Sequence, residues 1–240
     1  MSAPSLRARI RSGLTEEIKA VARRRLAADG ANMSLRGVAR DLGMAPSALY
    51  RYFPSRDDLL TALIREGYQA MAEAARQAET RAPRTDLRER WLAAGHGVRD
   101  WALAHPAEYG LLYGSPVPGY SAPHDTVAPA ASVIFMLVEI AAAATPAEVL
   151  HPAPLPEPLR ADLRRLIDQR GGGIGEELLE RVFAGWTHLF GLVSFEVFGR
   201  LEGTIEARRE YFDHQMGLMA DLAGLPPSTA QPEARPRLTP

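Results

Sequence analysis

The side chains with the clearest chemistry in this sequence gather between Ser34 and Arg56, and that chemistry is hydrogen bonding to nucleic acid. Hydroxyl, phenol and guanidinium groups recur in this stretch at close spacing. Groups of these types donate to the phosphate oxygens and to the base edges of DNA. The residues that we expect to contact DNA are Ser34, Arg36, Ala45, Pro46, Ser47, Ala48, Tyr50, Arg51, Tyr52 and Arg56.

We expect these residues to divide between the phosphate backbone and the bases. Arg56 and the backbone amides that follow Ser34 suit phosphates, because the free amides of a helix N-terminus point at anions. Ser47 and Arg51 are placed to read base edges, and Arg36 can reach either a phosphate or a guanine edge.

Tyr50 and Tyr52 add two phenol hydroxyls, which suit phosphate oxygens. Single residues also have structural alternatives, since Tyr50 can pack against the preceding helix and Arg36 can simply be solvated. The prediction of DNA binding therefore rests on the whole group of residues and not on any one of them.

The remaining sequence contains no recognised catalytic pattern. Its six histidines form no His-Glu-x-x-His motif, and neither a Gly-x-Ser-x-Gly elbow nor a phosphate-binding loop occurs. The absence of cysteine excludes disulfides and thiolate metal sites, and it favours a reducing cytoplasm. We therefore expect no enzyme activity, no metal site and no cofactor.

The expected DNA-contacting residues need short helices to position them. Ser34 can cap a helix over 35–42, Gly43 can end it, and Pro46 can open a second helix over 46–53. Two short helices joined by a glycine-containing turn are typical of the helix-turn-helix. A third helix is expected from Ser55 to about residue 82, and a first helix, capped by Thr15, over 14–28. Residues 1–13 are expected to form a flexible arm.

The run LRGVARDLGMAPSALYRYFPSRDDLL, residues 35–60, resembles the DNA-binding domain of TetR/AcrR-type transcriptional regulators. The resemblance covers about residues 14–65 and is carried by the core LYRYFPSR. Two positions depart from the family pattern. Ala45 stands where a serine or threonine usually caps the second helix, and Arg56 stands where lysine is usual. The resemblance implies an all-α protein with an N-terminal three-helix DNA-binding domain over 14–65.

A helical ligand-binding and dimerisation domain is expected over 66–225, followed by a disordered tail over 226–240. The segments WALAHPAEYGLLYGSPVPGY and GWTHLFGLVSFEVFG resemble the WHG-type C-terminal domains of the same family, with Phe190 in place of the usual histidine before Gly191. Helical periodicity predicts a helix that carries Leu87 to Trp101 and is broken at His105-Pro106, followed by a short helix that holds Tyr109 and Tyr113. Further helices are predicted over 126–144, 159–170, 176–200 and 205–222.

Aromatic residues on several of these helices predict an apolar pocket for a small effector, since such pockets form between the helices of bundles. The alternative is that these side chains fill the core. Glu139 and His188 are the polar groups that such a pocket could use. The predicted effector-binding residues are Trp101, Tyr109, Tyr113, Phe135, Glu139, Phe183, Trp186 and His188.

The last two helices have wide apolar faces, which predict that two copies pair as a homodimer. The expected interface residues are Phe190, Val193, Val197, Phe212 and Met219. Such a dimer would set two recognition helices about 34 Å apart, which is one turn of DNA. The resemblance thus implies a repressor that a small apolar effector releases from a palindromic operator.

Charge and hydropathy agree with a DNA-binding protein of the cytoplasm. Residues 1–81 carry 14 basic and nine acidic side chains, although the whole chain has a net charge of −1. The apolar run over 128–144 contains Glu139 and Pro129, so we expect a buried helix and no membrane span. Two alternatives stay open, namely a DNA-binding dimer that responds to no effector and a helical enzyme.

Overall fold

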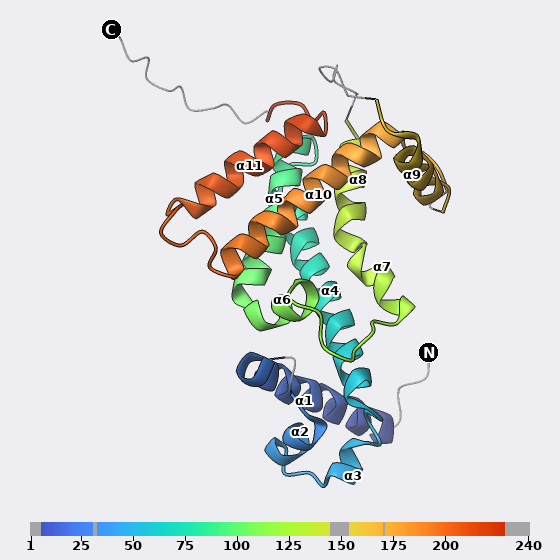
Figure 1. Ribbon diagram of the computed structural model, residues 1–240, viewed down its shortest axis with the longest axis vertical. Coiled ribbons are helices and arrows are strands. Elements are labelled where there is room, and N and C mark those ends of the chain that lie inside the picture. Colours follow the sequence, from blue (N-terminus) through green and yellow to red (C-terminus); the bar gives the residue numbers. More distant parts are fainter. Residues whose placement is uncertain (1–5, 31–32, 145–153, 170, 229–240) are drawn as a thin grey trace. The chain divides into compact units, whose positions relative to one another are not determined.

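A computed structural model describes residues 6–30, 33–144, 154–169 and 171–228, and all regular elements in these ranges are helices (Figure 1). This confirms the predicted all-α fold. Residues 1–5 of the predicted arm and residues 229–240 of the predicted tail lie outside the described ranges. The helices are α1 (Leu6–Asp29), α2 (Leu35–Asp41), α3 (Pro46–Leu49), α4 (Arg56–Arg81), α5 (Leu87–Ala104), α6 (Pro106–Tyr113), η2 (His124–Thr126), α7 (Val127–Ala130), α8 (Ser132–Ala142), α9 (Glu157–Gln169), α10 (Glu176–Val197) and α11 (Arg208–Leu222).

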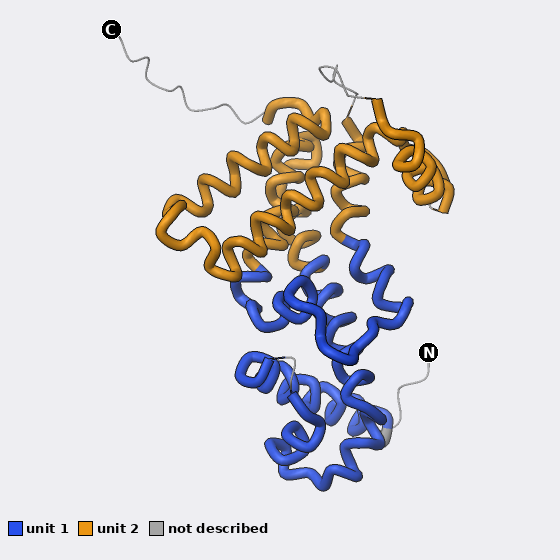
Figure 2. Tube along the Cα trace, viewed as in Figure 1, with its two compact units in different colours: residues 1–72, 101–132 blue, residues 73–100, 133–240 orange. Residues whose placement is uncertain are grey.

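The chain divides into two compact units (Figure 2). The first unit consists of residues 1–72 and 101–132, and the second of residues 73–100 and 133–240. Helix α6 and the segment that follows it thus belong with the N-terminal helices, although they come later in the chain. The domain boundary predicted at residue 65 follows the sequence and stays a prediction.

The core of the first unit forms where α1, α2, α3 and the start of α4 turn their apolar faces inward. Ile18, Val38, Leu49 and Leu60 are completely buried there. These residues recur at the helical spacing read from the sequence, so the amphipathic pattern placed them correctly. The consequence for function is that the opposite faces of α2 and α3 are available to solvent.

Local side-chain bonds start two of these helices. The Ser34 hydroxyl accepts a hydrogen bond from the Gly37 amide at 3.2 Å, and the Ser55 hydroxyl accepts one from the Asp58 amide at 3.0 Å. Both caps were predicted. Ala45 makes no side-chain cap at the start of α3, where Pro46 occupies the first turn. Helix α3 therefore begins with a fixed proline φ but without a capping hydroxyl.

Helix α1 begins at Leu6 and not at the predicted Leu14. Thr15 consequently lies inside the helix, where its hydroxyl donates to the Arg11 carbonyl at 2.9 Å, so the predicted Thr15 cap is wrong. No proline interrupts residues 6–13, and an interior glycine such as Gly13 opposes a helix by only about 1 kcal/mol. Leu6 and Ile10 extend the periodic pattern but remain mostly exposed.

The second helix of the helix-turn-helix is shorter than predicted. Helix α3 ends at Leu49, and residues 50–52 continue as turns in which the Tyr52 amide donates to the Leu49 carbonyl at 2.8 Å. Pro54 keeps the helix from continuing past Phe53, because the residue before a proline is sterically restricted away from the α conformation. Phe53 is nevertheless buried.

The apolar stretch predicted as one helix over 126–144 is divided into η2, α7 and α8, with a break at Ala131. Among the described residues, His124–Ala142 is the one segment whose length and composition would allow it to cross a membrane, and 44% of its most apolar window is buried inside the protein. Val133, Leu137 and Ile140 are buried at helical spacing. Burial of this kind is also typical of a core helix.

The second unit is built on the packing of α10 against α11 and α9. Trp91 is completely buried, and its ring occupies the space beside Gly185, where an added Cβ would lie 2.8 Å from Trp91 Cζ2. Arg99 and Glu196 form a buried ion pair with an Nη2–Oε1 distance of 2.5 Å. Arg160 on α9 reaches Glu176 on α10 at 2.7 Å.

Candidate nucleic-acid interface

The predicted DNA-contacting residues gather on the solvent-facing side of α2, α3 and the turns after α3. Leu49 points into the core, whereas Ser47, Tyr50 and Arg51 are exposed. Ser34, Arg36, Ala45 and Pro46 are exposed as well, and Ala48, Tyr52 and Arg56 are partly exposed. The structure therefore places all ten predicted residues at least partly in reach of a ligand.

The charge of this surface is strongly positive. Between residues 34 and 56 the sequence has four arginines and one acidic residue, Asp41. Arg25 on α1 neutralises that carboxylate, with donor–acceptor distances of 2.7 and 2.8 Å. The hydrogen bonds from Arg25 hold the pKa of Asp41 below its ordinary value. Because Asp41 is paired with Arg25, the positive charges of the arginines on α2 and in the turn after α3 remain available to a polyanion.

Arg25 is a positioning residue that sequence reasoning missed. Besides Asp41, it binds Asp29 at 2.8 Å, and its guanidinium lies so close to Gly37 that an added Cβ would be 2.8 Å from Nη1. It therefore fixes α2 against α1. The sequence shows only a run of arginines in the last part of α1, which does not name the partner Asp41.

Arg56 has a position that agrees only in part with its expected role. Its Nε donates to the Met33 carbonyl at 3.1 Å, so the guanidinium links the start of α4 to the segment that precedes α2. Its Nη1 lies 3.7 Å from Asp57. This anchoring holds the Arg56 side chain beside Ser34, where the N-terminus of α2 begins. The phosphate contact predicted for Arg56 remains a prediction.

Arg11 is a second residue that sequence reasoning missed. Its Nη2 lies 3.5 Å from the Arg51 carbonyl, and its guanidinium carbon lies 5.8 Å from the centre of the Tyr52 ring. The early start of α1 brings this arginine beside the turn after α3. The basic composition of residues 7–11 was visible in the sequence, but an arm expected to be flexible could not be given a place.

The predicted effector-binding residues divide between the two units, three in the first and five in the second. In the first unit, Trp101 stacks on His105, and the buried Tyr109 stacks on Tyr113 at 5.1 Å. Burial raises the pKa of Tyr113 far above its usual range. Trp101 and Tyr109 are buried, as the core alternative expects, whereas Tyr113 is half-buried.

The effector residues predicted in the second unit also have different surroundings. Phe183 and Trp186 meet edge to face at 5.8 Å, whereas Phe135 and Glu139 face solvent. His188 lines a groove of about 590 Å³ between α10 and α11, where its Nε2 lies 3.0 Å from Gln215 Oε1. Whether the eight residues contribute to one effector site stays a prediction.

Burial corrects part of the predicted dimer interface. Val193 and Phe212 are buried inside the second unit, and Phe190 is nearly so, because these positions face the core of the unit itself. Met219 lines the groove between α10 and α11, and Val197 is half-buried. The exposed apolar side chains on and just after these helices are instead Phe195, Phe198, Leu218 and Leu222.

Comparison with known proteins gives the same assignment in both halves of the chain. Residues 18–63 match the family described as bacterial regulatory proteins, tetR family. Residues 91–219 match the tetracyclin repressor-like C-terminal domain. The second match alone covers more than half of the chain.

Individual relatives agree. The HTH-type transcriptional regulator Rv1816 of Mycobacterium tuberculosis is 36% identical over 194 residues, which cover 79% of this chain and 83% of the relative. The regulator Mb1846 of Mycobacterium bovis matches with the same values. A crystal structure of the regulatory protein SCO4313 is 32% identical, with a TM-score of 0.72 over 92% of this chain and 98% of that one.

A tetR-family regulatory protein from Rhodococcus RHA1, at 18% identity, shares the fold with a TM-score of 0.61 over 88% of this chain and 97% of that one. The outward face of α2 and α3, its positive charge and both family matches lead to one assignment. The chain belongs to the TetR family of transcriptional regulators, which are DNA-binding proteins and not enzymes.

Proposed function

We propose that the protein is a homodimeric repressor that acts in the cytoplasm, binds a pseudo-palindromic operator and leaves it when a small apolar effector binds. The observation that carries the DNA-binding step is the outward face of α3, where Ser47 and Arg51 are exposed while Leu49 anchors the helix in the core. A helix held in this way can enter the major groove with its polar side chains first.

The homodimer follows from the apolar groove on the second unit. Phe195 and Leu222 line this groove and remain substantially exposed in a single copy. Apolar surface of this kind on two neighbouring helices is covered when the same two helices of a second copy pack against it. A two-fold dimer also explains why the operator should be pseudo-palindromic, since each half-site meets one recognition helix.

The proposed release by an effector is an example of thermodynamic linkage, in which the binding of one ligand changes the affinity for another. If the effector favours a dimer in which the recognition helices no longer fit successive turns of DNA, effector and operator weaken each other's binding by the same factor. The long helix α4 would connect the DNA-binding and effector-binding parts of the chain, because it starts in the helix-turn-helix and ends in the second unit.

The DNA-reading step is tested with a duplex from the upstream region of the protein's own gene. We expect Arg51→Ala to weaken binding about tenfold or more, because a lost base or phosphate contact costs about 1–3 kcal/mol. Ser47→Ala should change the preference among single-base variants of the duplex. Arg76→Ala is the matched control, because Arg76 is an exposed arginine of α4 outside the predicted interface. Equal affinities for all four proteins would contradict the assignment.

The effector step is tested by adding a library of lipophilic compounds to the DNA-bound protein. Release by some compounds and not by others supports regulation by a ligand. Tight DNA binding that no compound changes would favour a DNA-binding dimer without an effector.

A further inference from the structure

The first two turns of α1, residues 6–13, extend this helix beyond the core of the first unit. Leu14 packs against that core and Ile18 is completely buried in it. Leu6 and Ile10 continue the same apolar stripe, but they are 65% and 62% exposed. At 1.5 Å per residue, this N-terminal extension is about 12 Å long. Core packing therefore does not account for the extension, and its other contacts become informative.

The charges of the N-terminal extension are all positive. Arg7, Arg9 and Arg11 lie within it, and the first acidic residue of the chain is Glu16. Arg9 and Arg11 are exposed, and no carboxylate in the described part of the chain pairs with either of them. Both charges are therefore available to an anionic partner.

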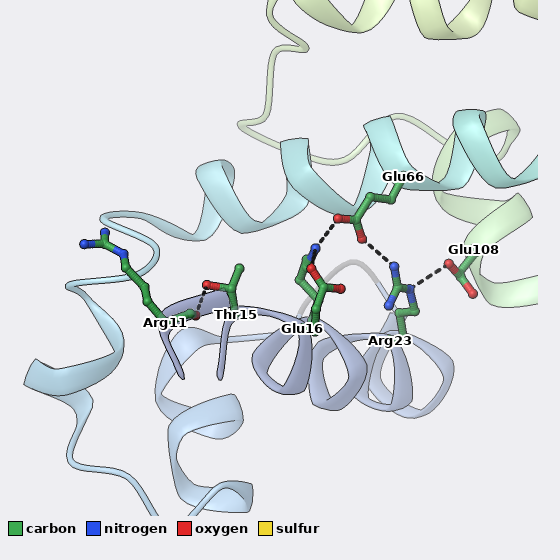
Figure 3. A network of polar contacts seen from close by, with 7 residues as sticks. Arg11, Thr15, Glu16, Arg23, Glu66 and Glu108 are labelled. Atoms are coloured by element: carbon green, nitrogen blue, oxygen red, sulfur yellow. Dashed lines mark hydrogen bonds and ion pairs between the residues drawn. The ribbon is translucent and has the colours of Figure 1, made fainter. Parts of the chain in front are cut away.

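Figure 3 shows that the arginines of α1 are used in different ways. Arg23 lies between two carboxylates, since its Nη2 donates to Glu66 at 2.5 Å and its Nε donates to Glu108 at 3.0 Å. Arg11 lies at the other end of the group of residues drawn, and its side chain points away from these carboxylates. Arg23 is thus engaged within the fold, whereas the Arg11 guanidinium is directed elsewhere.

The Arg11 side chain lies beside the turn that follows α3. Its guanidinium carbon lies over the Tyr52 ring, 5.8 Å from the ring centre, which is within the range of a cation–π contact. Its Nη2 lies 3.5 Å from the Arg51 carbonyl oxygen, a distance that is long for a hydrogen bond. The ring therefore holds the guanidinium in place, while its N–H groups remain able to donate to a ligand.

Helical spacing gives Arg9 and Arg11 different directions. At about 100° per residue, Arg11 projects from nearly the same side of α1 as Ile18, which faces the core and the elements packed around it. Arg9 is about 200° further round the helix and thus projects from the opposite side. The two arginines have the same charge and similar exposure, but Arg11 is the one that reaches Tyr52.

Phosphate is the anion that suits the Arg11 and Tyr52 side chains together. A guanidinium can donate two parallel hydrogen bonds to one phosphate, and a phenol hydroxyl can donate one more. Competition from a nearby carboxylate is small, because Asp41 is held by Arg25. Both side chains lie beyond the last residue of α3, so they are placed beside the helix expected to read base edges.

We propose that Arg11 and Tyr52 together bind one phosphate of the DNA backbone, at the border of the groove that α3 enters, and that the N-terminal extension of α1 holds Arg11 at this position. This inference rests on the proposed function, because it requires DNA on the outward face of α3. Arg11 contacts the phosphate directly and, by lying over the Tyr52 ring, also fixes the direction of the phenol hydroxyl.

The phosphate contact is tested by fluorescence anisotropy with the full-length protein, a labelled duplex from the gene's own upstream region and an unrelated duplex of the same length. Arg11→Ala should make the slope of log binding constant against log salt shallower by about one on both duplexes, because a phosphate contact carries no sequence information. Arg11→Lys keeps the charge and should keep the slope. Arg9→Ala is the matched control and should bind as the wild type does.

An unchanged slope in Arg11→Ala, or an equal loss in Arg9→Ala, would overturn the inference. A loss confined to the upstream duplex would indicate a base contact and would overturn it as well. A wild type that binds neither duplex would instead contradict the proposed function itself.

The pairing of the two side chains is tested with Tyr52→Phe, which keeps the ring and removes the hydroxyl. If both side chains bind one phosphate, the double variant with Arg11→Ala should lose less affinity than the product of the two single losses. Losses that multiply independently would show that Arg11 and Tyr52 act at separate places.

Discussion

Ser47 and Leu49 are two residues apart on α3, yet one is exposed and the other completely buried. This division is what makes a helix of four residues usable as a reading element. Leu49 and the following Phe53 hold it to the core, while Pro46 fixes the first φ angle. What the helix lacks is a capping side chain, because Ala45 cannot accept a hydrogen bond from the free amides.

The missing cap leads to a prediction for Ala45→Ser. A serine at this extended N-cap position can accept a hydrogen bond from the amides of α3 and should stabilise the fold by about 0.5–1 kcal/mol. Thermal unfolding should then shift upward by about 2 °C. Ala48→Ser places the same hydroxyl inside α3 and should give no such gain. A stability of Ala45→Ser equal to or below that of the wild type would show that α3 needs no cap.

Asp41 gives a prediction about pH. Because the bonds from Arg25 lower its folded pKa, the pair adds stability above the ordinary aspartate pKa of about 3.9, and this stability is lost as the pH falls through the lower folded value. Asp41→Asn should therefore unfold more easily than the wild type at pH 7, and this difference should shrink as the pH falls below the ordinary aspartate pKa. A difference that persists unchanged at low pH would mean that the charge of Asp41 contributes nothing.

At the scale of helices, the close packing of Trp91 against Gly185 helps to hold α5 and α10 together in the second unit. Gly185 on α10 leaves room for the ring of Trp91, so Gly185→Ala should destabilise the protein by about 1–3 kcal/mol. Gly13→Ala is the control, because a Cβ added there would have no heavy atom within 4 Å and a helical alanine should stabilise α1 by about 0.5–1 kcal/mol. Denaturant unfolding of both variants would measure this contrast. Equal effects of the two substitutions would contradict the packing argument.

The helices themselves were largely predictable, because their apolar spacing and the caps at Ser34, Ser55 and Asp86 act locally. The Asp86 carboxylate accepts a hydrogen bond from the Glu89 amide at 2.9 Å, which is a contact across three residues. The predictions were wrong where contacts between residues far apart in the sequence determine the structure. The extension of α1 to Leu6, the end of α3 at Leu49 and the burial of Tyr109 depend on neighbours that the local pattern does not name.

For the candidate site, the sequence predicted the exposure of the side chains, whereas their contacts with DNA stay a prediction. The ten residues predicted to contact DNA follow from helix faces and from the family resemblance, and the structure leaves all of them at least partly exposed. Arg11 and Arg25 were missed because their partners, Tyr52 and Asp41, lie 41 and 16 residues away in the sequence. A spread of aromatic residues, in turn, could not distinguish a pocket from a packed core.

At the scale of the whole molecule, the proposed dimer makes a prediction for Phe195. This side chain is 56% exposed and lines the groove on α10 and α11, so Phe195→Glu should place a charge in the dimer interface and shift the protein toward monomers. Sedimentation velocity measures this shift. Leu159→Glu, at an exposed leucine of α9, should leave the assembly unchanged. An unchanged dimer in Phe195→Glu would exclude the groove as the interface.

The central claim, that the face of α2 and α3 binds DNA, is tested most directly by the dependence of binding on salt. Phosphate contacts release counterions, so the logarithm of the binding constant should fall linearly and steeply with the logarithm of salt concentration. Fluorescence anisotropy with a labelled duplex from the gene's own upstream region gives this slope. We expect a steep slope for the wild type and a shallower one for Arg56→Ala. No binding, or an affinity that does not change with salt, would contradict the account.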